Sequence, residues 1–171
     1  MRPRFHQLNQ GWNAEPYAPN PVLEIQGGDL VLRFLVNAFQ FTEFREGESG
    51  MLRFTACERY RLGPTDDEGW YGGQCRFSRL APEWGEFYLV VGDAALLDAP
   101  KDWQTLAPPS GQGRHFLFYF RDNTFECVAR QCLPDPNPDN ALLRTDKQLP
   151  EISPADLKPS AVIRKRLCRS Q

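Results

Sequence analysis

The stretch TDDEGWYGGQCRF, residues 65–77, is the first place where residue types could do chemistry, because it sets three consecutive carboxylates beside two aromatic rings. A second acidic and aromatic stretch, PEWGEFY, follows at residues 82–88. Two carboxylates that face each other can supply a general acid and a general base, as glycoside hydrolysis requires. Trp and Tyr among carboxylates are also typical of a surface that binds a protein partner. Adjacent acids in a loop rich in Gly and Pro are, however, most often solvated turn residues.

The rest of the sequence contains few residues in patterns that support catalysis. It has two histidines, His6 and His115, and no Cys-x-x-Cys pair, so the nitrogen and sulfur ligands of a zinc site are missing. The glycines of GPTDDEGWYGG come without the Lys and Ser or Thr of a phosphate-binding loop. His115 alternates with aromatic residues, which favours a structural role. We therefore expect no enzymatic activity, no metal and no cofactor.

Charge is distributed unevenly along the chain. Residues 144–171 hold seven Lys or Arg against three acids, a balance of +4, so the remainder carries −6 of the formal net charge of −2. An acidic body argues against nucleic-acid binding, which relies on clustered Lys and Arg, and it favours a basic partner. The longest apolar run, residues 30–36, is already broken by Arg33 and is far shorter than the ~20 residues that span a bilayer. Five cysteines without a repeated spacing indicate buried thiols, and we expect a cytoplasmic protein with no membrane partner.

Alternation of apolar and polar residues with a period of two predicts β-strands along most of the chain. Residues 22–25 and 29–36 predict a hairpin around Gly27 and Gly28. The longest alternation, at residues 52–62, predicts one continuous strand with five residues on its apolar face: Leu52, Phe54, Ala56, Tyr60 and Leu62. Further strands are expected at residues 74–80 and 86–93, and a second hairpin at residues 115–129 with its turn at Asp122 and Asn123.

Strands of this kind close over one core as a mainly β protein, an antiparallel β-sandwich or a strongly bent sheet. One helical turn is expected near residues 98–103. After Cys132 the prolines of LPDPNPDN end the alternation, so we assign residues 1–133 to a β-rich domain. Residues 134–171 are assigned to a Pro-rich, basic tail that packs on the domain or on a partner, with a short helix from Ser160. The predicted core comprises Leu32, Phe34, Leu52, Phe54, Phe77, Phe116, Phe118 and Phe120.

The two acidic stretches together form the candidate partner-binding surface. Its predicted residues are Asp66, Asp67, Glu68, Trp70, Tyr71, Glu83, Trp84, Glu86 and Tyr88. A carbohydrate-binding or small-ligand module would instead use the four aromatic residues of this set to line a pocket. A hydrolase would use two of its carboxylates facing each other. Trp residues can also fill the open end of a small β-sandwich, so part of the set is expected to be buried.

The sequence resembles a family of small, uncharacterised bacterial cytosolic proteins. The resemblance spans residues 7–127 through LNQGWNAEPYAPNP, NAFQFTEF, LRFTACERYRLGPTDDEGWYGGQCRFS, APEWGEFYLVVGD and RHFLFYFRDNTFEC, and it leaves the tail unmatched. It implies no catalytic residues. Small acidic bacterial proteins of this kind are similar to immunity proteins, which neutralise toxins delivered between competing cells. The resemblance thus implies a protein toxin as the partner, expected to be a nuclease whose basic active site the acidic loops would bind and occlude. The oligomeric state is left open.

Overall fold

Two hairpins, each formed by strands adjacent in the sequence, organise the fold. The structure is a computed structural model that describes residues 2–64, 67–92, 94–144 and 149–153. In the first hairpin, β2 (Val22–Gln26) pairs with β3 (Asp29–Leu35), and Gly27 takes a φ of 63° in the connecting turn, as the glycine signal predicts. The second hairpin joins β8 (Arg114–Tyr119) to β9 (Asn123–Ala129). Its turn lies at residues 121–122, one residue earlier than expected.

The expected single strand at residues 52–62 is in fact two strands in different sheets. β4 (Ser49–Thr55) pairs with β3, whereas β5 (Arg59–Pro64) pairs with β9. The chain turns at Ala56, which has a φ of 46° and is exposed, so the prediction that Ala56 faces the core is wrong. A left-handed residue ends the extended backbone, and the alternation resumes afterwards, so periodicity alone does not reveal the break.

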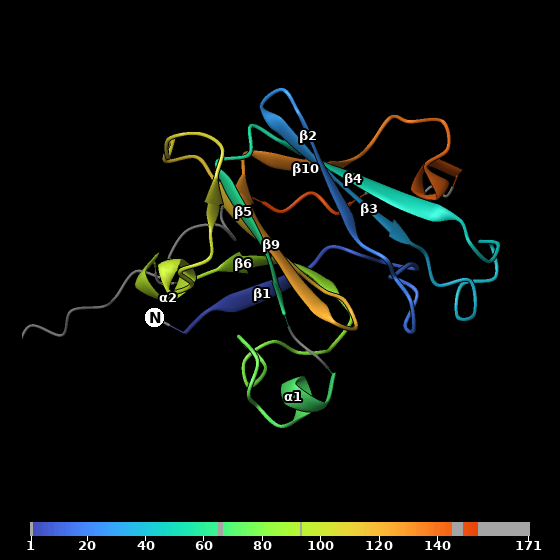
Figure 1. Ribbon diagram of the computed structural model, residues 1–171, viewed down its shortest axis with the longest axis horizontal. Coiled ribbons are helices and arrows are strands. Elements are labelled where there is room, and N and C mark those ends of the chain that lie inside the picture. Colours follow the sequence, from blue (N-terminus) through green and yellow to red (C-terminus); the bar gives the residue numbers. More distant parts are fainter. Residues whose placement is uncertain (1, 65–66, 93, 145–148, 154–171) are drawn as a thin grey trace, which may run out of the picture.

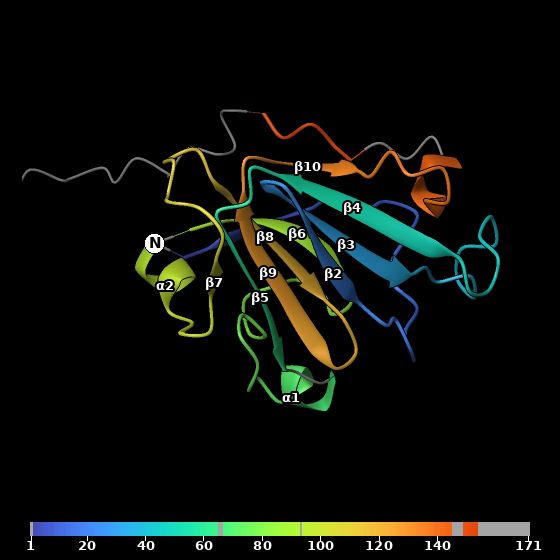
Figure 2. The same cartoon turned by 45° about the horizontal axis from the view of Figure 1, so that its top comes forward.

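The remaining strands complete two antiparallel sheets, which confirms the mainly β fold class. They are β1 (Arg4–Gln7), β6 (Phe87–Val91), β7 (Gln104–Thr105) and β10 (Gln131–Pro134). The strand order is β1-β6-β8-β9-β5-β7 in the six-stranded sheet and β10-β4-β3-β2 in the four-stranded sheet. Figures 1 and 2 show β2, β3 and β4 running at an angle to β5 and β9, so that the two groups of strands diverge from one end.

The core between the sheets is rich in Phe. All eight residues of the predicted core are buried, and seven of them belong to this cluster. Phe34 and Phe118 meet edge to face with their ring centroids 5.2 Å apart, and Trp12 stacks on Phe34 at 5.8 Å. Phe77 is buried elsewhere, in a second cluster on the outer face of the six-stranded sheet.

Part of that outer face is covered by residues 74–80, for which the sequence predicted a strand. Residues 74–80 form turns, not a strand: the Leu80 and Ala81 amides both donate to the Phe77 carbonyl at 2.8 Å. Two short helices that alternation did not indicate, α1 (Asp67–Tyr71) and α2 (Ala94–Asp98), lie on this side. The helical turn expected at residues 98–103 is therefore displaced to the segment just before it.

The first part of the predicted tail is built into the four-stranded sheet. β10 pairs with β4 and crosses the predicted domain boundary at residue 133. Asn140 then accepts from the Met51 amide and donates to the Met51 carbonyl, both at 2.9 Å, which seats the 3₁₀ helix η1 (Ala141–Arg144) beside β4. The predicted helix from Ser160 lies outside the described residues. Within the described ranges, no helix has the length and apolar character needed to cross a membrane.

We expect Ala56→Gly to raise the free energy of unfolding by about 0.5–1 kcal/mol, because it relieves a left-handed alanine while keeping the amide that donates to Asp29. Ala95→Gly, at an exposed position of α2, is the matched control and should lower the free energy by a similar amount. Urea unfolding measures both, and equal losses in the two variants would contradict the assignment of strain to Ala56.

Candidate functional site

The structure divides the nine predicted site residues by exposure. The side chains of Asp67, Glu68, Tyr71 and Glu83 are exposed, and those of Trp84 and Glu86 are half-buried. Trp70 and Tyr88 are buried in the second cluster, so these two aromatic residues support the surface from below and do not form it. Asp66 lies outside the described residues.

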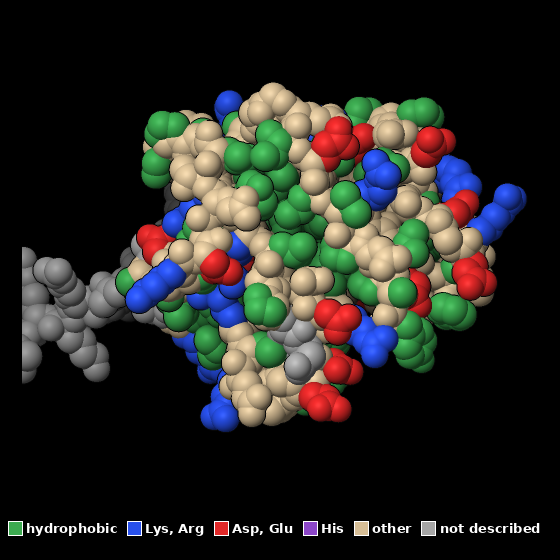
Figure 3. Space-filling model, viewed as in Figure 1, with side chains coloured by type: hydrophobic (Ala, Val, Ile, Leu, Met, Phe, Trp, Pro, Cys, Tyr) green, Lys and Arg blue, Asp and Glu red, His purple; other side chains and the backbone are tan. Residues whose placement is uncertain are grey.

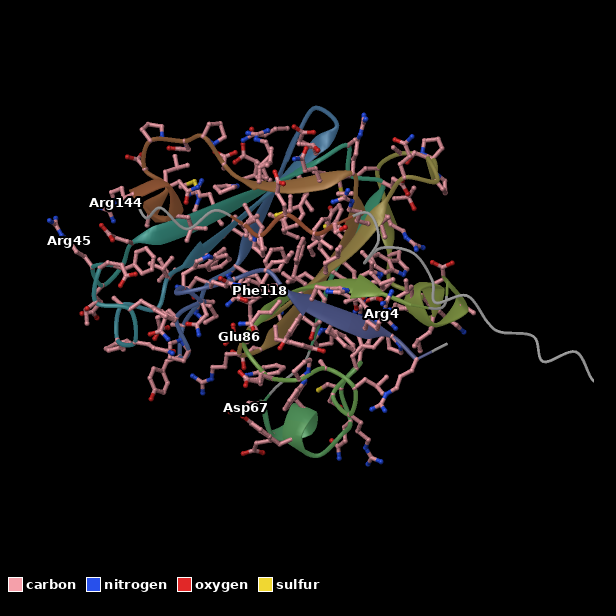
Figure 4. The ribbon with its side chains drawn as sticks, turned by 180° about the vertical axis from the view of Figure 1, so that it is seen from behind. Arg4, Arg45, Asp67, Glu86, Phe118 and Arg144 are labelled. Carbon is pink, nitrogen blue, oxygen red and sulfur yellow. The ribbon has the colours of Figure 1, made fainter. Side chains whose placement is uncertain are left out.

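A contact between two tryptophans brings the two acidic stretches together. Trp70 of α1 and Trp84 have their ring centroids 5.9 Å apart, and both rings pack on Tyr119 of β8 at 6.2 and 5.1 Å. Figure 4 shows the result: Asp67 on α1 and Glu86 before β6 lie at the same end of the molecule. Residues well separated in the sequence therefore share one face, which we call the carboxylate face and define as Asp67, Glu68, Tyr71, Glu83 and Glu86.

Local backbone geometry explains why α1 forms in so short a segment. Asp67 and Glu68 occupy its first turn, where the partial positive charge of the helix start favours carboxylates. The helix ends at Tyr71, and Gly73 beyond it takes a φ of 73°, with its amide donating to the Trp70 carbonyl at 3.0 Å. Trp70 is thereby directed inward, while Tyr71 beside it is 74% exposed.

Tyr88 fixes the turn that carries Glu83. Its hydroxyl accepts from the Glu83 amide and donates to the Glu83 carbonyl, both at 3.1 Å. Burial raises the pKa of Tyr88 to about 12, so the hydroxyl stays protonated and keeps both bonds at neutral pH. Tyr88 is thus a positioning residue for the turn.

Glu86 ties the N-terminal segment to this end of the sheet. Its carboxylate accepts from the side-chain amides of Gln7, at 3.1 Å, and Asn9. Burial raises the pKa of the Glu86 carboxyl, the amide bonds from Asn9 and Asn13 oppose that shift, and the nearby charge of Glu83 adds to it. Because both amides donate to the same oxygen, Oε2, Glu86 holds the N-terminal segment and also contributes negative charge to the face.

Among the described residues, three carboxylates of the face have no partner of opposite charge. Within the part of the chain that the structure describes, none of Asp67, Glu68 and Glu83 forms an ion pair with Lys or Arg, whereas other acids such as Asp98 and Asp135 do. Figure 3 shows acidic side chains gathered at the lower end of the view, where α1 lies in Figure 1. Solvated carboxylates without cations project a negative field toward an approaching partner.

The sequence did not reveal a second polar arrangement, which is buried in the six-stranded sheet. Glu126 of β9 is fully buried, and its carboxylate accepts from Arg61 and Arg76 at 2.7 Å and contacts His115 Nε2 at 2.6 Å. Arg61 also reaches Asp102 at 2.8 and 3.0 Å. The signal in the sequence was a Glu inside the apolar alternation of residues 123–129, where a charge must be paired.

These contacts keep Glu126 ionised and orient the ring of His115 toward it. Burial alone would raise the pKa of Glu126, but the hydrogen bond from His115 and the charges of His115 and Arg76 hold it below its ordinary value. Nε2 of His115 therefore carries the proton. Nδ1 is buried without a partner among the described residues, and so is Nε1 of Trp103, whose ring meets the His115 ring edge to face at 5.7 Å.

Two cavities bear on the alternative functions. One, of about 500 Å³, is lined by residues that include Arg59, Arg114 and His115, and the other, of about 480 Å³, lies between β10 and residues 149–152. None of Trp70, Tyr71, Trp84 and Tyr88 lines either cavity. Comparison with protein-family models, with curated proteins and with solved structures finds no match to this chain. The family resemblance in the sequence therefore stays a prediction.

Glu126→Gln should lower the free energy of unfolding by about 3–5 kcal/mol at pH 7, because it leaves two half-buried arginines without their shared, fully buried carboxylate. The pKa of Glu126 is lower in the folded state than its ordinary value of 4.5, so the ionised carboxylate stabilises the fold above pH 4.5. This stabilisation is lost as the pH falls through the lowered pKa. The variant should thus show a shallower loss of stability below pH 4.5 than the wild type.

Asp102→Asn is the matched control, since it removes the exposed partner of Arg61 and should cost about 1 kcal/mol or less. Urea unfolding across the acid range gives both quantities. If the two variants lose the same stability at pH 7, Glu126 is not the carboxylate that holds this cluster together.

Proposed function

We propose that this chain is an immunity protein that binds a bacterial effector toxin through the carboxylate face and occludes its active site. The observation that carries the proposal is that exposed carboxylates from two separate stretches, at Asp67, Glu68 and Glu83, share one end of the molecule without ion pairs among the described residues. A surface of this kind suits a basic site, and nucleases have basic substrate grooves. The protein would act by binding in the cytoplasm of the cell that makes it, and not by catalysis.

The anchor of the proposed interface is Tyr71. Interface hot spots favour Tyr surrounded by polar groups, and this ring projects into solvent directly after the acidic first turn of α1. Behind it, Trp70 and Trp84 hold the acidic segments on Tyr119, so the face is preorganised and loses little freedom on binding.

The small-ligand and hydrolase alternatives have weaker support. A ligand module would line a cavity with the aromatic residues of the face, yet Trp70 and Tyr88 are buried and the two cavities described above are lined by other residues. A hydrolase would need a carboxyl that is free to donate a proton, and Glu86, whose pKa is raised by burial, is bonded to amides.

The double variant Asp67→Lys, Glu68→Lys should slow association with the toxin by about tenfold at low salt, because attraction between opposite charges steers the encounter. The difference should shrink as ionic strength rises and screens the exposed charges. Stopped-flow association with the toxin, measured at several salt concentrations, tests this, and survival of cells that express the toxin provides the functional readout.

The control with the same change of charge is Glu46→Lys, Asp139→Lys, two exposed acids outside the carboxylate face. It should affect association much less. If the two double variants protect cells equally and associate equally fast, the carboxylate face is not the inhibitory surface. If deletion of the gene leaves the strain resistant to its sister strains, the immunity proposal itself fails.

A further inference from the structure

The outermost strand of the four-stranded sheet, β2, has an open edge. It pairs with β3 on one side only, and four of its five residues are exposed. Its side chains include two large apolar ones, Val22 at 54% and Ile25 at 51% exposure. In the part of the chain that the structure describes, no strand pairs with the other side of β2. Such an edge is a template for an added strand.

The other sheet edges carry the features that normally prevent added pairing. β7 has only two residues, and β10 ends at Pro134 with residues 149–152 beside it across a cavity. β1 carries Arg4 and His6. β2 contains no proline and no basic residue, so it is the edge with the least protection in the described structure.

Alternation in the ladder identifies the backbone groups that are open. In a hairpin with a two-residue turn, the flanking pair Gln26 and Asp29 exchanges backbone bonds, and every second pair repeats this. Val22 and Glu24 therefore direct their backbone groups to β3. Leu23 and Ile25 direct theirs to the open edge, where an added strand would bond to both.

Side chains along β2 specify what such a strand would carry. Leu23 packs against the core, and on the neighbouring sheet Tyr60 and Leu62 of β5 are also only partly buried. Figure 3 shows hydrophobic side chains gathered in the area between β2 and β5 of Figure 1. Apolar residues opposite Leu23 and Ile25 would extend the core over this area.

The charge of Glu24 selects among the possible occupants. A second copy of the chain, paired antiparallel over the whole of β2, would set Glu24 directly opposite its own counterpart, and like charges in that position destabilise a sheet. Glu24 has no ion pair with Lys or Arg among the described residues and accepts only from Gln26 at 3.0 Å. It is therefore free to pair with a cation.

We propose that β2 accepts an extended segment of a partner protein in the pattern apolar–basic–apolar, with its Lys or Arg opposite Glu24 and its apolar residues opposite Leu23 and Ile25. The segment adds a fifth strand to the four-stranded sheet. This surface lies outside the carboxylate face, and the inference does not depend on the proposed function.

The probe is a capped peptide with the core Thr-Val-Lys-Val-Thr, titrated into the full chain and followed by the backbone amide resonances of Leu23 and Ile25. We expect saturable shifts at these two amides, and at least about tenfold weaker binding of a matched peptide with Glu in place of Lys. Glu24→Lys should reverse that preference. A wild-type chain that does not distinguish the two peptides, or whose β2 amides do not shift, would overturn the proposal.

Ile25→Pro removes a donor on the open edge while leaving the bonds to β3 in place, so it should abolish peptide binding. Ile25→Thr keeps the donor and is the control. Peptide binding that survives Ile25→Pro would overturn the proposal, and Glu24→Lys decides the question if the proline variant does not fold. Sedimentation that shows a wild-type dimer, lost on Ile25→Pro, would also overturn it, because the occupant would then be a second copy of this chain.

Discussion

A single buried carboxylate ties the outer layer of this protein to its sheet. Glu126 sits on β9 where no water can solvate it, and its charge is acceptable only because Arg61, Arg76 and His115 reach it from three other segments. Arg76 then extends the connection, since its guanidinium also donates to the carbonyls of Leu96 and Leu97 at 2.9 Å. The turns after α1 and the end of α2 are therefore held by the same ion cluster.

This cluster gives the six-stranded sheet two unlike faces. The face toward the four-stranded sheet is packed with Phe, which needs shape but no specific partners. The outer face combines aromatic packing around Tyr119 with the ion cluster at Glu126, so its covering segments are placed by directional contacts. The carboxylate face rests on that second layer, because Trp70 and Trp84 both pack on Tyr119.

The features that could be predicted from the sequence are those determined by residues close together along the chain. Both hairpins and the Phe core were predictable, because alternation and glycine turns act over a few residues. The change of sheet at Ala56 was missed because the alternation continues on both sides of it. Residues 74–80 resembled a strand although they form turns, since Cys75 and Phe77 alternate with the polar Arg76 and Ser78 as they would in a strand.

The sequence showed the two acidic stretches of the candidate site, but it did not show that they lie close together in the fold. The Trp70 contact with Trp84 joins segments that no local rule connects, and the burial of Trp70 and Tyr88 depends on the layer that they help to form. Glu126 carried a signal, a charge within an apolar strand, but its partners Arg61 and Arg76 come from elsewhere in the chain. Sequence patterns can indicate that a buried charge needs partners without identifying them.

Because the chain changes sheet at Ala56, three strands of the four-stranded sheet are synthesised before most of the six-stranded sheet. Strands β2, β3 and β4 form a continuous antiparallel meander that is complete once the ribosome has delivered Thr55. The strands that cover its apolar face end only at Ala129, and β1 finds its neighbour β6 more than eighty residues later in the chain. Contacts this distant in sequence form slowly, so the nascent meander must wait with its Phe residues uncovered. During that interval the growing chain exposes apolar surface that can aggregate and that the finished protein buries.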